Sequence, residues 1–334
     1  MKSPTFPALV QGFFTGRLLG QLNASPHTVA SYRDTFRLLL RFTAERFGRA
    51  PSEIRLEEID APFVGQFLDY LQRKRGNGAR TRNVRLAAVR AFFRYVSFTE
   101  PGHALDCQRV LAIPAKRHER KLVAFLTEAE AQALIEAPDP DRWLGRRDRV
   151  LLRVAVQTGL RNSEITSLRC RDVEPGAGAA GAHVRCSGKG RKMRCTPLRS
   201  DVAEGLRRWL AERQGAPEDP VFPSSRGGPL SADALQRLVA GHAVAARRKC
   251  PSLKGKVVTP HTLRHTAAMD LLRRGVDLTV IALWLGHEST ETTEVYLHAD
   301  MELKERALGH ASHTGTPPHR FQANDRLLTF LESL

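Results

Sequence analysis

The segment from His261 to Tyr296 gathers residue types that can act on a phosphate. It contains His261-Thr-Leu-Arg264-His265, then Gly-His287, and then Tyr296. An arginine guanidinium grips phosphate oxygens through paired, charge-assisted hydrogen bonds. A phenol with an ordinary pKa of about 10 is a poor nucleophile at neutral pH, so it needs a proton acceptor and a positive field. Histidine is suited to moving that proton. The segment therefore suggests attack of a tyrosine on a phosphodiester.

A metal site is the alternative for the same histidines. His261 and His265 are four residues apart on a predicted helix, which is a spacing that metal ligands use. The zinc-protease pattern needs a glutamate where Thr262 stands, and no cluster of thiolates is at hand. Because cations can supply the charge that a metal supplies elsewhere, we predict no metal and no cofactor.

Two upstream stretches add cations to this set. Arg161 stands at the start of a predicted helix capped by Asn162 or Ser163, where the helix dipole already favours an anion. Lys189 lies in a glycine-rich turn between predicted strands at 182–186 and 195–198, and such a hairpin can extend a lysine into a cleft. Taken alone, each is an ordinary surface feature. The turn lacks the spacing of a nucleotide-binding P-loop.

The overall charge indicates a polyanionic partner. The chain has 334 residues, a net charge of +17 and a pI near 10.4. Nucleic acid and an anionic membrane surface both fit this charge, which does not by itself give a function. No membrane span is expected because there is no apolar run of about 18 residues, and the first 20 residues do not resemble a signal peptide. Five cysteines without a C-x-x-C pair favour reduced thiols, Cys186 and Cys195 included, and a cytoplasmic location.

A second charged region precedes these motifs. Between Tyr70 and Thr99 there is no acidic residue. Surface helices usually mix charges of both signs, so the imbalance favours phosphate contacts over a merely solvated face. The predicted DNA-binding side chains are Arg73, Lys74, Arg75, Arg80, Arg82, Arg85, Arg90 and Arg94.

The predicted domain boundaries follow breaks in the helical pattern. Residues 1–24 are weakly patterned, and Ser25-Pro26 then begins a helix. The chain is expected to leave helical structure at 101–110. A capping box at Thr127 and Glu130 begins a new unit. The expected divisions are a helical domain at 1–112, a linker at 113–122, a catalytic domain at 123–310 and a tail at 311–334. The tail is expected to dock either on its own domain or on a neighbouring protomer.

Five motifs occur together in a characteristic order. They are Thr158-Gly-Leu-Arg161-x-x-Glu164-Ile, Gly188-Lys-Gly190, His261-x-Leu-Arg264-His265, Leu285-Gly-His287 and Thr293-x-x-Tyr296. In this order the chain resembles the tyrosine site-specific recombinases of the phage integrase family, strongly over 123–310 and by general pattern over 20–112. The resemblance implies a mainly α fold with a small β-sheet. It also implies an N-terminal helical, SAM-like core-binding domain and a C-terminal α+β catalytic domain.

The resemblance also implies a role for each residue at the phosphate. Tyr296 would form a 3′-phosphotyrosyl link, and Arg161 and Arg264 would clamp the scissile phosphate. His287 would donate a hydrogen bond to that phosphate. Glu164 would orient Arg161 from behind.

Proton transfer would involve two further residues. His261 would handle the proton of the tyrosine, and Lys189 would protonate the leaving 5′-hydroxyl. Lys192 is an alternative for the lysine, and we prefer Lys189 because of its Gly-Lys-Gly setting. The phosphotyrosyl bond conserves energy, so no ATP is expected.

The partner implied is double-stranded DNA bearing a recombination site. Four protomers would exchange strands through a Holliday junction, with a monomer or dimer away from DNA. The sequence from Ile281 to Ser289 resembles recombinases carried by mobile elements. The alternatives are a type IB topoisomerase, which shares this chemistry, and a non-catalytic DNA-binding protein, for which the complete catalytic set would be unexpected.

Overall fold

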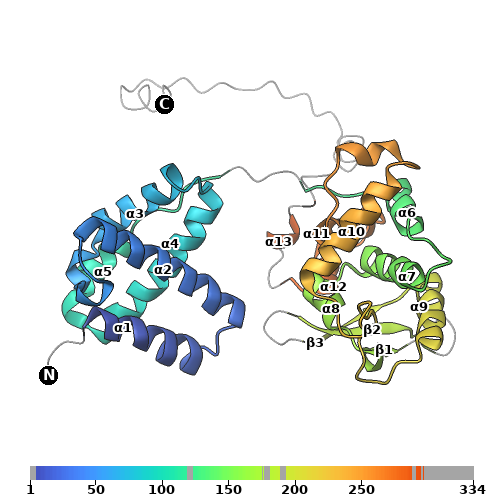
Figure 1. Cartoon of the computed structure of the whole chain (residues 1–334), viewed down its shortest axis with the longest axis horizontal. Coiled ribbons are helices and arrows are strands. Elements are labelled where there is room, and N and C mark those ends of the chain that lie inside the picture. The colour runs from blue at the N-terminus through green and yellow to red at the C-terminus, as the bar shows by residue number, and fades with distance from the viewer. Residues whose placement is uncertain are drawn as a thin grey trace, which may run out of the picture. The chain divides into compact units, whose positions relative to one another are not determined.

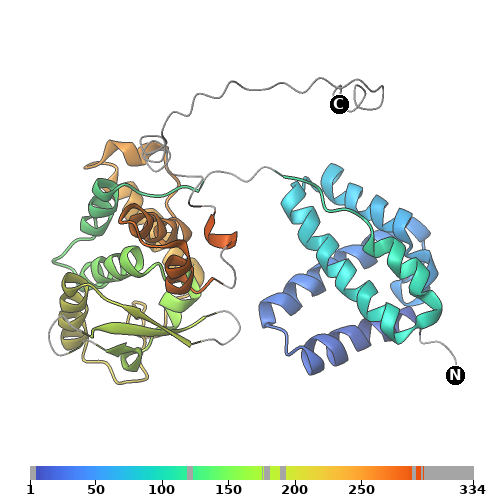
Figure 2. The same cartoon turned by 180° about the vertical axis from the view of Figure 1, so that it is seen from behind.

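The chain folds as two units, Met1–Arg120 and Lys121–Leu334, in the computed structural model (Figure 1). The structure describes residues 5–118, 123–174, 176, 181–188, 193–287, 291–294 and 296. Both views show helices throughout and one small sheet, which belongs to the second unit (Figure 2). Within the described residues, no helix is both long and apolar enough to cross a membrane.

The first unit is entirely helical in its described part. Ser25 caps α2 with its hydroxyl, and Pro26 occupies the first turn, as the sequence predicts. The expectation that 101–110 leaves helical structure is wrong, because a short helix buries Cys107 and Val110 against the core. The weak pattern before residue 24 also forms helix. The elements are α1 Phe6–Gly12, the π-helix η1 Phe13–Gln21, α2 Pro26–Phe47, η2 Pro51–Glu53, η3 Leu56–Glu58, α3 Ala61–Arg73, α4 Ala79–Thr99, η4 Pro101–His103 and α5 Ala104–Leu111.

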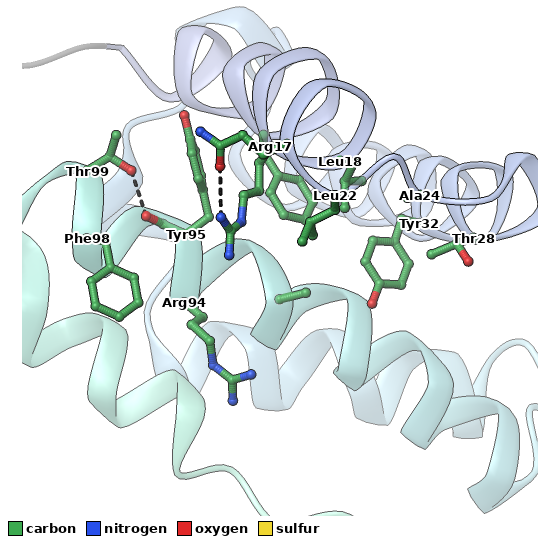
Figure 3. A pocket seen from close by; sticks show the side chains of 13 residues that line it. Arg17, Leu18, Leu22, Ala24, Thr28, Tyr32, Arg94, Tyr95, Phe98 and Thr99 are labelled. Atoms are coloured by element: carbon green, nitrogen blue, oxygen red, sulfur yellow. Dashed lines mark hydrogen bonds between the residues drawn. The ribbon is translucent and has the colours of Figure 1, made fainter. Parts of the chain in front are cut away.

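Aromatic side chains fill the core of this unit. Phe92 of α4 meets Phe36 of α2 edge-on at 5.2 Å between ring centroids, and it meets Phe13 of η1 at 5.6 Å. A pocket opens between η1, α2 and α4, where Arg17 and Arg94 stand beside apolar side chains (Figure 3). These contacts give the unit a core of its own.

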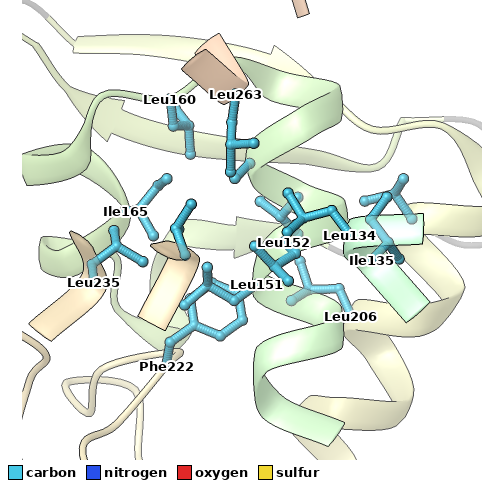
Figure 4. Packing of buried hydrophobic residues seen from close by; sticks show 14 of the residues in the cluster. Leu134, Ile135, Leu151, Leu152, Leu160, Ile165, Leu206, Phe222, Leu235 and Leu263 are labelled. Carbon is cyan, nitrogen blue, oxygen red and sulfur yellow. The ribbon is translucent and has the colours of Figure 1, made fainter. Parts of the chain in front are cut away.

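The second unit packs helices around α7 and places a sheet at one side. Leu151 and Leu152 of α7 lie among Leu134, Leu206 and Leu263 from three other helices (Figure 4). The elements are α6 Glu128–Glu136, α7 Trp143–Thr158, α8 Asn162–Ser167, η5 Cys170–Asp172, β1 Val173–Glu174, β2 His183–Ser187, β3 Met193–Pro197, α9 Ser200–Arg213, α10 Ala232–Ala246, η7 Pro251–Gly255, α11 Pro260–Arg273, α12 Leu278–Leu285 and α13 Glu291–Glu294. The predicted class, mainly α with a small sheet in this unit, is confirmed.

The sheet is antiparallel, with strand order β1-β2-β3. The two predicted strands are present, and β1 is an addition that the sequence did not reveal. Cys186 of β2 lies opposite Arg194 of β3. Cys186 is buried, Cys195 is exposed, and both are free thiols, as predicted.

A smaller apolar cluster joins α11, α12 and Tyr296, which lies two residues beyond the end of α13. The buried ring of Tyr296 packs there with Met269 and Leu272 of α11 and with Ile281 and Leu285 of α12. The predicted capping box begins α6, since Thr127 and Glu130 bond each other's backbone. These elements position the side chains of the candidate active site.

Candidate active site

Arg161 is held at the N-terminus of α8. Its backbone N–H donates to Glu164 at 2.7 Å, so Arg161 itself takes the cap position that we expected at Asn162 or Ser163. Its guanidinium donates to Glu164 Oε1 at 3.0 Å and to the carbonyl of Gly286 at 2.7 Å. The side chain remains 29% exposed, so it is fixed yet accessible.

Arg264 is fixed in the same way from α11. Its two terminal nitrogens donate to the carbonyls of Gly159 and Leu285, each at 2.7 Å. Burial, and then the charge of Arg161, lower the pKa of Arg264 to about 10, so it stays charged at neutral pH. Because Leu285 and Gly286 are consecutive, one turn anchors both guanidinium groups.

Glu164 forms the centre of a buried charge network that includes a residue absent from our sequence predictions. Arg194 of β3 donates to both carboxylate oxygens, at 2.7 and 2.8 Å. Burial alone would raise the pKa of Glu164, but the hydrogen bonds from Arg194 and Arg161 outweigh it and leave that pKa lowered. Arg194 therefore supports Arg161 through the carboxylate that they share.

Tyr296 lies against α11 with only 2% of its surface exposed. Its hydroxyl is 3.0 Å from Nδ1 of His265. Burial raises the pKa of Tyr296, while the charges of Arg264 and Arg161 act in the opposite direction. The hydroxyl of Tyr296 therefore keeps its proton at neutral pH, although it lies in the positive field of Arg161 and Arg264.

His287 follows the turn that anchors the arginines. Gly286 adopts a left-handed conformation with φ +65°, which ends α12 and redirects the chain. Nδ1 of His287 pairs with the hydroxyl of Thr293 at 2.8 Å, and the His287 ring stacks parallel to Tyr296 at 6.5 Å. Burial and the nearby arginines lower the pKa of His287 to about 4, so it is neutral at physiological pH.

His261 is exposed on α11, one turn before His265, with their ring centroids 4.2 Å apart. The structure therefore gives the hydrogen bond to the tyrosine hydroxyl to His265, whereas the resemblance assigned the tyrosine proton to His261. Lys189 and its alternative Lys192 lie outside the described residues. Among the described residues, no group of three or more His, Cys, Asp or Glu side chains is placed to hold a metal ion.

Comparison with known proteins agrees with this arrangement. The phage integrase family model matches residues 124–302, and the model for the phage integrase N-terminal SAM-like domain matches residues 13–97. The chain belongs to the phage integrase family. It is 51% identical to a putative integrase/recombinase, y4rC, from Sinorhizobium fredii, over 100% of this chain and 99% of the relative. It is 33% identical to the tyrosine recombinase XerC of Pelobacter propionicus, over 84% of this chain and 87% of that protein.

A solved structure has the same fold. The XerH site-specific recombinase, bound to palindromic difH substrate in a post-cleavage complex, aligns with a TM-score of 0.69 at 24% identity. The alignment covers 86% of this chain and 81% of that chain. The family match and the identity to XerC show that the chain is a tyrosine recombinase, an enzyme that cleaves and rejoins DNA.

The basic residues predicted to bind DNA divide into two groups in this recombinase. Arg82, Arg85 and Arg90 turn back into their own unit: Arg85 donates to Ser31 and Thr35 of α2, while Arg82 and Arg90 donate to the segment after α5. Their charge is therefore engaged in holding the fold. The exposed group comprises Arg73, Lys74, Arg75, Arg80 and Arg94.

The sequence offered a signal for one of the two residues that we overlooked. His265 stands inside the motif already identified, four residues after His261, so it shares a face of the predicted helix. Arg194 had no such local signal, because its partner Glu164 is 30 residues away and the pairing depends on how β3 lies beside α8.

Proposed function

We propose that this recombinase cuts duplex DNA at a specific site by forming a covalent bond between Tyr296 and a 3′-phosphate. The phenolic oxygen attacks phosphorus while the bond to the 5′-oxygen breaks. The phosphotyrosyl ester retains the energy of the broken bond, so rejoining requires no nucleotide. The observation that carries the proposal is the anchoring of Arg161 and Arg264 to consecutive carbonyls beside the buried Tyr296.

The two arginines would clamp the scissile phosphate. Each is held at its terminal nitrogens by acceptors behind it, so little reorganisation is needed when charge develops on the phosphate oxygens. His287, placed by the same turn, would donate a hydrogen bond to the phosphate. His261 would face the phosphate from the exposed side of α11. Lys189, in the hairpin between β2 and β3, would protonate the leaving 5′-oxygen.

The N-terminal unit would grip the duplex as a core-binding domain. The exposed Arg73 is the last residue of α3, Lys74 and Arg75 follow it, and Arg80 lies in the first turn of α4, so these side chains form one concentrated basic region. We propose that the domains divide at 113–122 and that residues 311–334, which lie outside the described part, dock on a neighbouring protomer.

Strand exchange between two duplexes sets the number of protomers. Two duplexes have four strands to cut, and each chain supplies one Tyr296. A homotetramer on two sites, passing through a Holliday junction, therefore satisfies the chemistry. The name of the 51%-identical relative, a putative integrase/recombinase, supports DNA integration as the reaction. We propose that a mobile element carries the gene.

The experiment uses nicked duplex fragments of the DNA that flanks the gene. A nick lets the short cleaved strand diffuse away, so a covalent protein–DNA adduct accumulates and survives denaturation. We expect adducts with the wild type and with Tyr70→Phe, a control that also removes one phenolic oxygen. Tyr296→Phe should bind the same DNA without forming adducts. Sequencing the captured DNA gives the recognition site.

Adducts that persist in Tyr296→Phe would refute the assignment of the nucleophile. Relaxation of any supercoiled plasmid by a single protomer, without the captured site, would instead favour a topoisomerase. The second outcome would leave the chemistry at Tyr296 intact and change only the biological reaction.

A further inference from the structure

The hydroxyl of Tyr296 has a specific partner in the site. It lies 3.0 Å from Nδ1 of His265, and the two rings meet at 65° with their centroids 5.5 Å apart. The tyrosine ring belongs to an apolar cluster with Met269 and Leu272 of α11 and with Ile281 and Leu285 of α12. His265 is therefore fixed on α11, and the cluster holds Tyr296 beside it.

The surroundings determine which atom donates. The groups facing His265 are His261 and Arg264 on α11, His287 after α12, and the phenol itself. Adjacent positive charge and partial burial disfavour a second proton on the ring. A neutral imidazole carries one N–H and one bare nitrogen. A phenol with its proton in place therefore donates to Nδ1, while Nε2 keeps the ring hydrogen.

We propose that His265, rather than His261, accepts the proton of Tyr296 as the phenolic oxygen attacks the DNA; this inference rests on the proposed function. The bond from the Tyr296 oxygen to phosphorus forms as the bond from phosphorus to the 5′-oxygen breaks. The phenolic proton passes to Nδ1 of His265, and the leaving oxygen takes its proton from Lys189. Rejoining reverses each step: His265 returns its proton to Tyr296, and the 5′-hydroxyl returns its proton to Lys189.

Substrate binding supplies the timing of this transfer. Burial, then His261 and Arg264, lower the pKa of His265 to about 3, which makes it a weak base. A phosphate bound by Arg264 brings a negative charge that offsets part of this effect. The imidazole then becomes a stronger base once the scissile phosphate is in place. Before DNA is bound, His265 is a weak base, and this restrains attack by the tyrosine.

The test compares His265→Asn with the matched variant His261→Asn in the full chain. Cleavage of the duplex recovered by covalent capture is followed under single-turnover conditions across a range of pH. Each variant is also prepared with a fluorinated tyrosine at 296, whose hydroxyl loses its proton more readily. Loss of a proton acceptor should slow cleavage by roughly 10²–10⁴-fold.

Four results would support the inference. The rate of His265→Asn should rise with pH where the wild-type rate is level, and the fluorinated tyrosine should recover on the order of tenfold or more of its loss. His261→Asn should show neither effect. A substrate whose 5′-bridging oxygen is replaced by sulfur, which leaves without a proton, should rescue Lys189→Ala and not His265→Asn.

Rescue of His261→Asn by the fluorinated tyrosine, or absence of rescue in both His265→Asn and His265→Gln, would overturn the inference. The second substitution guards against a variant that fails to fold, and tryptophan fluorescence checks the fold of each. Cleavage by Tyr296→Phe would instead refute the proposed function, so the two failures are distinguishable.

Discussion

Replacement of Glu164 by glutamine should destabilise the C-terminal unit far more than its small change in shape suggests. The carboxylate is 2% exposed and accepts from the backbone and side chain of Arg161 and from both terminal nitrogens of Arg194. A glutamine keeps one acceptor oxygen and turns an NH₂ group towards guanidinium donors. Removing one partner of a buried ion pair costs about 3–5 kcal/mol, because the remaining charge stays buried and unpaired.

The matched control is Glu218→Gln. Glu218 pairs with Arg171 at the surface, where the two side chains are 68% and 58% exposed. An exposed pair contributes about 0–1 kcal/mol. For a unit of this size, about 2–4 °C per kcal/mol predicts a fall in melting temperature of roughly 6–20 °C for Glu164→Gln and at most about 4 °C for Glu218→Gln.

Tryptophan fluorescence measures this unit selectively, since Trp143, Trp209 and Trp284 all lie in it. The pH dependence gives a second check. The pKa of Glu164 is lowered in the folded chain from an ordinary value of 4.5, so its stabilisation is fully present above that value. It is lost as the pH falls through the folded pKa, and the gap between wild type and Glu164→Gln should narrow there. Equal melting temperatures for the two variants would refute this account of the network.

Two further predictions concern the turn at Gly286 and the basic face of the first unit. Gly286→Ala places a methyl group 2.6 Å from Arg194 at φ +65°, whereas Gly275→Ala meets open space at φ +79°; both should lose about 1–2 kcal/mol of stability, and only the first should also slow adduct formation. Arg85→Ala should lower the melting temperature of the first unit by removing charged hydrogen bonds to α2 that contribute about 1.5–3 kcal/mol, with an unchanged salt dependence of DNA binding. Lys74→Ala should leave the melting temperature unchanged and should reduce the slope of log affinity against log salt by about 0.9. A slope equal to that of the wild type would exclude Lys74 from the interface.

The sequence predicted the parts of the site that depend on local order. The motif around Arg264 predicts that this side chain lies on a helix. Gly286 is predicted to end the helix formed by the apolar run before it, so His287 is expected directly after that helix. The expectation that Arg161 begins a helix is confirmed, although its cap position was misassigned by one residue or two. Short-range patterns contain this information because helix starts and stops are chemical properties of a few neighbouring residues.

The parts that the sequence did not predict depend on distant pairings or on rotation about a helix. Arg194 joins the site only because β3 lies beside α8. His261 and His265 share one helix face, so their spacing cannot show which of them reaches Tyr296. Arg85 was predicted to contact phosphate because a run of charges in the sequence does not show which way each side chain points. Its side chain points into the unit because its acceptors, 50 or more residues earlier, lie in α2.

The carbonyls that hold Arg161 and Arg264 belong to the main chain at Gly159, Leu285 and Gly286. No substitution can delete a peptide oxygen, so these three bonds depend on the shape of the two glycine turns, whereas the remaining bond of Arg161 depends on the side chain of Glu164. A designer seeking a new target sequence would accordingly leave these two turns and Glu164 untouched.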